Sequence, residues 1–148
     1  MWLEKEQFLV WNDRYSVGID FMDEQHRRLV EFANELYDGV FAALEASEFK
    51  KKREESFKAC MSASVDYVKT HFSAEEDLMR SLGYPKFPEH KTAHEEFVRQ
   101  VLEVSQRFEK GDQQMGKHFV YFLRDWLLEH IGVVDKELGM YAKNNQHS

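Results

Sequence analysis

The residues between His71 and His94 carry the strongest chemical signal in this sequence. His71 and Glu75 are four positions apart, and so are His90 and His94. On an α-helix, residues at this spacing lie on one face about one turn apart, so each pair can converge on one object. Imidazole and carboxylate groups that converge in this way are typical metal ligands. A Gly-Tyr-Pro break at residues 83–85 separates the two pairs, which predicts two neighbouring helices that share a metal site.

The composition is typical of a helical protein. The 148 residues include 12 Phe, 6 Tyr and 3 Trp but only 7 Gly and 2 Pro, too few for a loop-rich or all-β chain. A chain of this length is expected to form a single domain that buries roughly 70% of its unfolded surface. The net charge of −7 argues against nucleic acid as a partner, and the basic run at residues 50–53 is followed at once by two acids, which indicates a solvated helix face.

We expect a cytoplasmic protein that does not insert into membranes. No apolar run approaches the roughly 20 residues that span a bilayer. The first residues include Glu4 and Glu6, where a secretory signal would be basic. Cys60 is the one cysteine, so no intrachain disulfide can form. On an apolar helix face, Cys60 is interpreted as a small core residue rather than a nucleophile.

Hydrophobic periodicity predicts an all-α fold, an up-down-up-down antiparallel four-helix bundle with an N-terminal arm. In residues 1–19 no period is sustained, and we expect an ordered arm whose aromatic side chains lie on the body, with a frayed tail as the alternative. Asp20 is a good N-cap for a first helix that ends near residue 45. Further helices are expected at about 51–82, 88–111 and 115–143. Residues 20–143 would then form the bundle, and residues 144–148 a disordered tail.

Five of the seven histidines fall on the inward faces of these helices, and every helix contributes at least one. They are His26, His71, His90, His94 and His130. A single inward histidine such as His26 would more often be a hydrogen-bonded core residue than a ligand. His118 and His147 are interpreted as surface residues. The convergence of all four helices therefore favours a buried metal site.

Asp135 follows His130 by five positions, which a regular helix would separate by about 140° around its axis. Either Asp135 reaches the site from the flank, or a π-type turn brings the two residues together. Gly132 lies between them, where it would ease such a distortion and would let another backbone come close. We therefore predict a helix irregularity in residues 130–135.

The complete set, namely His26, His71-x3-Glu75, His90-x3-His94 and His130-x4-Asp135, resembles the ligand signature of the hemerythrins. The surrounding segments 11–19, 23–26, 75–79 and 84–85 also resemble this family, particularly its single-domain bacterial members, over about residues 11 to 142. The resemblance implies two non-haem irons joined by an oxo or hydroxo bridge. His90, His94 and His130 would bind one iron and His26 and His71 the other, with Glu75 and Asp135 bridging. This set is one bond short of two six-coordinate irons, so the two-histidine iron would keep an open position.

The resemblance further implies reversible O2 binding for transport, storage or delivery, rather than enzymatic turnover. Azide, nitric oxide and peroxide are further candidate ligands, and the sequence identifies no redox partner. Apolar residues beside the ligands are candidates for the lining of the ligand pocket, with ordinary core packing as the alternative reading. These residues are Leu29, Phe72, Trp126, Leu127 and Ile131.

Two other functions fit the same centre. One is a di-iron redox enzyme acting on peroxide or nitric oxide, and the other is an O2 or redox sensor module, which we rank lowest because an output domain is not evident. Ferritin-like carboxylate proteins use Glu-x-x-His motifs, and zinc proteases use His-Glu-x-x-His. Neither motif occurs in this sequence.

Overall fold

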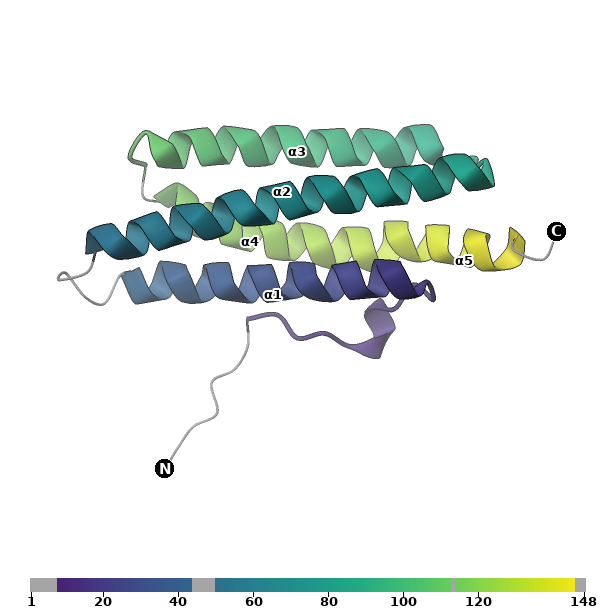
Figure 1. The fold of residues 1–148 in the computed structure, drawn as a ribbon, viewed down its shortest axis with the longest axis horizontal. Coiled ribbons are helices and arrows are strands. Elements are labelled where there is room, and N and C mark those ends of the chain that lie inside the picture. Colours follow the sequence, from purple (N-terminus) through teal and green to yellow (C-terminus); the bar gives the residue numbers. More distant parts are fainter. Residues whose placement is uncertain (1–7, 44–49, 113, 146–148) are drawn as a thin grey trace, which may run out of the picture.

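The computed structural model describes residues 8–43, 50–112 and 114–145, and for residues 40–43 and 50–53 it describes the backbone alone. The helices are α1 (Asp20–Ala43), α2 (Lys50–Leu82), α3 (Phe87–Glu109), α4 (Gln114–Glu129) and α5 (Lys136–Asn145). A 3-10 turn, η1 (Asp13–Tyr15), precedes α1, and a π-helical turn, η2 (His130–Asp135), joins α4 to α5. Figure 1 shows that α4, η2 and α5 form one continuous rod.

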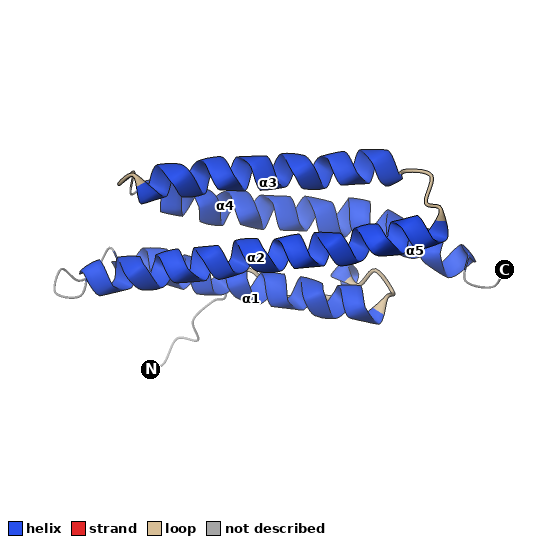
Figure 2. Ribbon diagram, turned by 45° about the horizontal axis from the view of Figure 1, so that its top comes forward, coloured by secondary structure: helices blue, strands red, loops and turns tan. Residues whose placement is uncertain are grey.

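The four rods form the predicted up-down-up-down bundle. Helix α1 packs against α2 and α4, and α3 packs against the same two helices on the other side (Figures 1 and 2). In the described ranges no helix has the length and apolar character needed to cross a membrane. Residues 46–49, between the first two predicted helices, and the side chains of the basic run at 50–53 lie outside what the structure describes.

Two glycines end helices where the sequence predicts it. Gly83 and Gly111 adopt φ values of +60° and +103°, which L-residues with a side chain rarely reach. In each case the following N–H closes a six-residue turn: Tyr84 N donates to Met79 O at 3.0 Å, and Asp112 N donates to Arg107 O at 3.2 Å. These bonds satisfy carbonyls that the helix end leaves free. The turn after α2 then places the His71 pair beside the His90 pair.

Two predicted boundaries were wrong. Asp20 is the first residue of α1 rather than its N-cap. Asp23 instead anchors the chain that enters the helix: its carboxylate accepts hydrogen bonds from Val17 N at 2.8 Å and from Ser16 Oγ at 2.6 Å. At the other end, α5 continues through Asn145, so the first two residues of the predicted tail are helical.

Residues 8–19 form an arm that runs along the bundle, as predicted (Figure 1). Its Leu9 exchanges two backbone hydrogen bonds of 2.8 Å with the Asn34 side chain on α1. Trp11 packs against the main core cluster, with the Arg27 guanidinium 4.9 Å from its ring. The arm also meets α5, where a Cβ added to Gly139 would lie 2.0 Å from the Val17 carbonyl oxygen. The arm therefore ties α1 to the C-terminal rod.

The apolar core consists of two clusters. The larger one fills most of the bundle and includes Leu36, Phe57 and Phe119. The smaller one surrounds Met79 and Leu138 near the Gly83 turn. The inward histidines and carboxylates lie between the two clusters along each helix, so apolar layers close the site at both ends.

Cys60 is half-buried beside the α1 residue Glu35, with its Sγ 3.8 Å from Glu35 Oε2. Burial and the neighbouring carboxylate raise the pKa of the Cys60 thiol to about 11. The thiol therefore stays protonated at neutral pH, which agrees with a packing role rather than a nucleophile. It lies at the edge of the core rather than within it.

Candidate metal centre

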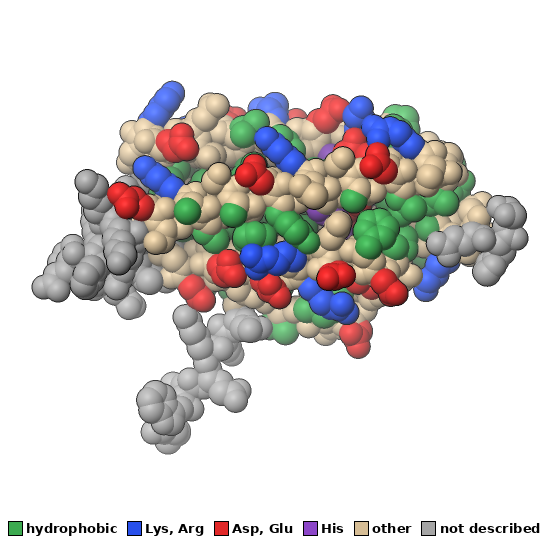
Figure 3. Space-filling model, viewed as in Figure 1, with side chains coloured by type: hydrophobic (Ala, Val, Ile, Leu, Met, Phe, Trp, Pro, Cys, Tyr) green, Lys and Arg blue, Asp and Glu red, His purple; other side chains and the backbone are tan. Residues whose placement is uncertain are grey.

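The structure brings together all seven residues that the sequence selects as metal ligands. Each is at most 3% exposed: His26, His71, Glu75, His90, His94, His130 and Asp135. His118 is exposed, as predicted, and His147 lies outside the described residues. Figure 3 shows acidic and basic side chains interspersed over one face of the bundle, with histidine visible only in small areas between helices. The candidate centre is therefore an interior site.

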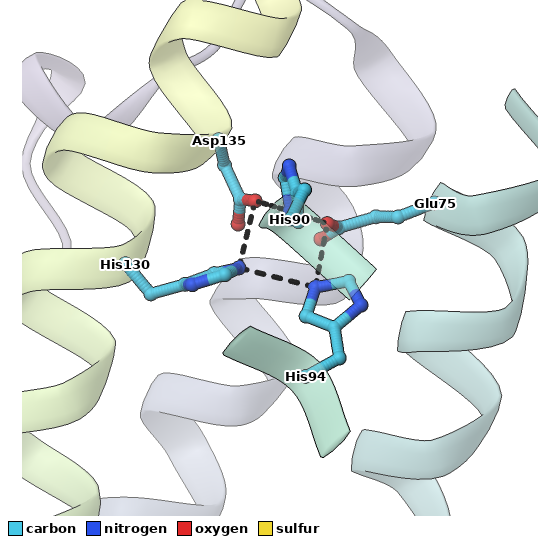
Figure 4. A group of neighbouring side chains, drawn as sticks. All are labelled: Glu75, His90, His94, His130 and Asp135. Carbon is cyan, nitrogen blue, oxygen red and sulfur yellow. Dashed lines mark hydrogen bonds and ion pairs between the residues drawn. The ribbon is translucent and has the colours of Figure 1, made fainter. Parts of the chain in front are cut away.

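The seven side chains form two groups that share both carboxylates. One group contains His90, His94 and His130, and the other contains His26 and His71. Glu75 and Asp135 belong to both groups, and the donor atoms of each group lie within 4.8 Å of one another. Figure 4 shows the first group, with side chains from α2, α3 and the C-terminal rod pointing toward one another.

Each carboxylate divides its two oxygens between the groups. Glu75 Oε1 lies 3.4 Å from His26 Nε2, whereas its Oε2 lies 3.1 Å from His90 Nε2. Asp135 Oδ2 lies 2.9 Å from His26 Nε2, whereas its Oδ1 lies 3.0 Å from His130 Nε2. A carboxylate with this arrangement can bridge two cations.

The spacing and directions of these atoms fit metal coordination better than mutual hydrogen bonding. An octahedron with bonds of about 2.1 Å has edges of about 3 Å, close to the separations seen here. His94 Nε2 and His130 Nε2 face each other at 3.2 Å. Both Asp135 oxygens are buried with no geometrically satisfactory hydrogen bond in the described structure, despite their close imidazole neighbours. The donors thus point at shared positions rather than at one another, so this residue set fits two metal ions.

When no metal is bound, protonated imidazoles must balance the negative charges of the Glu75 and Asp135 carboxylates. Burial raises the pKa of Glu75, but His71 and His26 outweigh burial and hold this pKa well below its usual value. Burial lowers the pKa of His26, but the close carboxylates of Asp135 and Glu75 outweigh burial and raise this pKa to about 9. The same balance raises the pKa of His90 to about 9. Bound cations would replace these protons as partners of the carboxylates.

The predicted irregularity at residues 130–135 is confirmed as a π-helical turn. The turn inserts one residue into the helical register, which brings Asp135 onto the same buried side as His130. The predicted close backbone contact at Gly132 was wrong, because a Cβ there would meet nothing within 4 Å. After the turn the buried face is shifted by one position. Asp135, Leu138 and Ala142 are buried, whereas Val134 and Tyr141, which an uninterrupted helical period would place inward, are half-buried.

The five predicted pocket residues lie in the core around the ligands. Phe72 stacks on His94 with ring centroids 3.7 Å apart, and Trp126 stacks on His130 at 4.1 Å. The other three are almost fully buried: Leu29, Leu127 and Ile131. A separate apolar cavity of about 10 Å³ lies between α2, α3 and α4, lined by Val68, Phe97, Leu123 and neighbouring residues. None of the five lines that cavity, and their role toward a ligand stays a prediction.

Two polar residues that the sequence patterns did not indicate contact candidate histidines from outside the site. His71 Nδ1 lies 2.6 Å from Gln25 Oε1, and His94 Nδ1 lies 3.3 Å from Glu76 Oε2. Each is the chain neighbour of a site residue, because Gln25 precedes His26 and Glu76 follows Glu75. A polar side chain directly beside an inward ligand on an amphipathic helix is the signal that could have found them.

The geometry defines a class of protein, the four-helix bundles that hold a pair of metal ions on inward histidines and carboxylates. Comparison with known proteins is more specific: the Hemerythrin HHE cation binding domain matches residues 17–142. This chain belongs to the hemerythrin family.

Named relatives and solved structures agree. A bacteriohemerythrin of Stenotrophomonas maltophilia is 36% identical over 123 residues, covering 83% of this chain and 74% of the relative. A bacteriohemerythrin of Clostridium acetobutylicum is 33% identical over 133 residues, covering 86% of this chain and 96% of the relative. The crystal structure of a wild-type hemerythrin superimposes with a TM-score of 0.75 at 28% identity, covering 90% of this chain and 96% of that one.

Proposed function

We propose that this protein binds O2 reversibly at a centre of two irons and serves in oxygen transport, storage or delivery. The observation that carries the proposal is the division of the Glu75 and Asp135 oxygens between a three-histidine group and a two-histidine group. The relatives named bacteriohemerythrin and the structures titled hemerythrin support it.

In this proposal the two histidine groups have different roles. His90, His94 and His130 would hold one iron, and His26 and His71 would hold the other, with Glu75 and Asp135 available to both. When bound, the irons supply reducing electrons and a coordination position that a small ligand can occupy. The two-histidine group offers one imidazole fewer, so the iron that it holds would have the open position for a small ligand. Azide, nitric oxide and peroxide are expected to compete for the same position.

The surrounding side chains would keep this position dry. Leu29, Phe72 and Ile131 carry no acid or base, and all three are buried. An apolar wall of this kind excludes water and withholds protons from a bound ligand, which favours its release over its conversion. This chemistry supports reversible binding, rather than enzymatic turnover, as the main function.

Two measurements on the purified protein test the proposal. Metal analysis should find two irons per chain, and the visible spectrum should change reversibly when the sample is cycled between nitrogen and air. Steady consumption of peroxide or nitric oxide with an electron donor would favour the redox enzyme instead. A protein that contains zinc or manganese, or whose spectrum does not return under nitrogen, would contradict the proposal.

A further inference from the structure

Gln25 and Glu76 lie outside the proposed ligand set, yet each contacts one of its histidines. Gln25, on α1, reaches His71 on α2, and Glu76, on α2, reaches His94 on α3. We propose that these two residues are positioning residues that make the two metal positions electronically unequal. The neutral amide supports the two-histidine position, and the carboxylate supports the three-histidine position. This inference rests on the proposed function.

The contact at His71 fixes the orientation and tautomer of that ring. His71 directs Nε2 toward Glu75 in the centre, so Nε2 must be unprotonated to bind a metal. The proton of the neutral ring then resides on Nδ1, which must donate. Gln25 Oε1 at 2.6 Å is the acceptor. The amide oxygen accepts this hydrogen bond without placing a negative charge beside the ring.

His94 also has a side-chain partner at Nδ1, but this partner is a carboxylate rather than a neutral amide. Glu76 Oε2 lies 3.3 Å from Nδ1, and the Glu76 side chain is only 16% exposed. Its other oxygen lies 4.0 Å from Arg80 Nη2, beyond hydrogen-bond distance. A carboxylate acceptor makes an imidazole more basic and therefore a stronger metal donor. Glu76 is thus expected to favour the higher oxidation state of the iron that His94 binds.

Two other histidines in the site have no such partner at Nδ1. Nδ1 of His26 and Nδ1 of His90 are buried with no hydrogen-bond partner in the described part of the chain. Each metal position therefore includes one histidine with a side-chain partner and one without. The chemical difference between these partners, amide against carboxylate, distinguishes the three-histidine position from the position proposed to bind O2.

Matched isosteric exchanges in the full-length, iron-loaded protein test this inference. Glu76→Gln should raise the reduction potential of the iron pair, and Gln25→Glu should lower it. We expect about a tenfold change in the equilibrium between oxidised and reduced protein, which is about 59 mV for a one-electron step. Glu95→Gln is the control, because Glu95 adjoins His94 in sequence but its side chain is 67% exposed. The control removes the same charge without touching a ligand.

A second measurement does not depend on redox behaviour. Gln25→Ala and Glu76→Ala should each weaken iron binding by about 10–100-fold, the usual effect of removing a partner of a metal-bound histidine. The inference would be overturned by two results together. The Glu76→Gln and Gln25→Glu exchanges would change the reduction potential no more than Glu95→Gln does, and the alanine variants would bind iron as tightly as the wild type. A different result would contradict the proposed function: a wild-type protein that does not hold iron or does not bind O2 reversibly.

Discussion

At the scale of residues, the centre depends on imidazoles that all present Nε2 to the interior while the two carboxylates divide their oxygens. His130 is the proposed ligand that the C-terminal rod adds to the three-histidine group, and its Nε2 lies 3.0 Å from Asp135 Oδ1. Removing this imidazole takes a donor from one metal position and a partner from a bridging carboxylate.

His130→Ala should therefore reduce the iron content from two irons per chain to one or fewer. An unsatisfied buried polar group costs roughly 1–3 kcal/mol, so the variant should also be less stable than the wild type. His118→Ala changes the same residue type at an exposed position of α4 and should leave both properties unchanged. Metal analysis and thermal unfolding of the two variants check this. Full iron loading of His130→Ala would remove His130 from the ligand set.

A second prediction at this scale concerns the apolar surroundings. Leu29→Ala should shorten the lifetime of the oxygenated form, because a smaller side chain one turn from His26 admits water to the ligand. Leu36→Ala is the matched control, since Leu36 is equally buried two turns further along α1. Both variants should lose about 2–5 kcal/mol of stability. The decay of the oxygenated form, followed by visible spectroscopy in air, should be faster in Leu29→Ala than in Leu36→Ala. Equal lifetimes would exclude Leu29 from the pocket.

At the scale of elements, the π-helical turn decides which side chains of the C-terminal rod face the centre. Gly132 lies in this turn, where an added Cβ would meet no other atom within 4 Å. Gly132→Ala should therefore fold normally and stabilise the protein by about 0.5–1 kcal/mol, because alanine loses less backbone entropy than glycine. Chemical denaturation measures the change. A clear loss of stability would show that the turn requires glycine.

Gly139, one element further along, should respond in the opposite way. A Cβ at Gly139 would lie 2.0 Å from the Val17 carbonyl oxygen, so the arm would have to move away from α5. Gly139→Ala should destabilise the protein by about 1–3 kcal/mol, as expected for overpacking. Limited proteolysis should cut the displaced arm faster than in Gly132→Ala. Unchanged stability and cleavage would mean that the arm does not depend on this contact.

At the scale of the whole molecule, the metal is expected to contribute to stability, because ligands from every rod meet at one point. Metal that binds only the folded state adds about 2.7 kcal/mol when its free concentration is 100 times its dissociation constant. For a chain of this size this corresponds to roughly 5–10 °C in melting temperature. Calorimetry of iron-loaded and metal-free protein checks the prediction. Equal melting temperatures would argue against a buried site.

Much of the molecule could be predicted from local patterns. The period of apolar residues gives the four helices, and Gly83 and Gly111 mark two of their ends because positive φ favours glycine. The same period shows which histidines face inward. The five-residue gap from His130 to Asp135 even indicates the π-helical turn, because a regular helix cannot bring both residues to one side.

The remaining features depend on contacts between distant segments, which a single sequence does not specify. The extra residue of the π turn shifts the buried face of α5 by one position, so Ala142 is buried and Tyr141 is only half-buried, and periodicity before the turn gives no sign of this shift. Gly139 is required by the arm, and the arm is positioned only once the bundle has formed. The sequence thus determined which residue types could bind metal. Only the tertiary structure decided that Glu75 and Asp135 divide their oxygens between two groups and that Gln25 and Glu76 hold histidines on the next helix, because both arrangements require helices to pack at fixed distances.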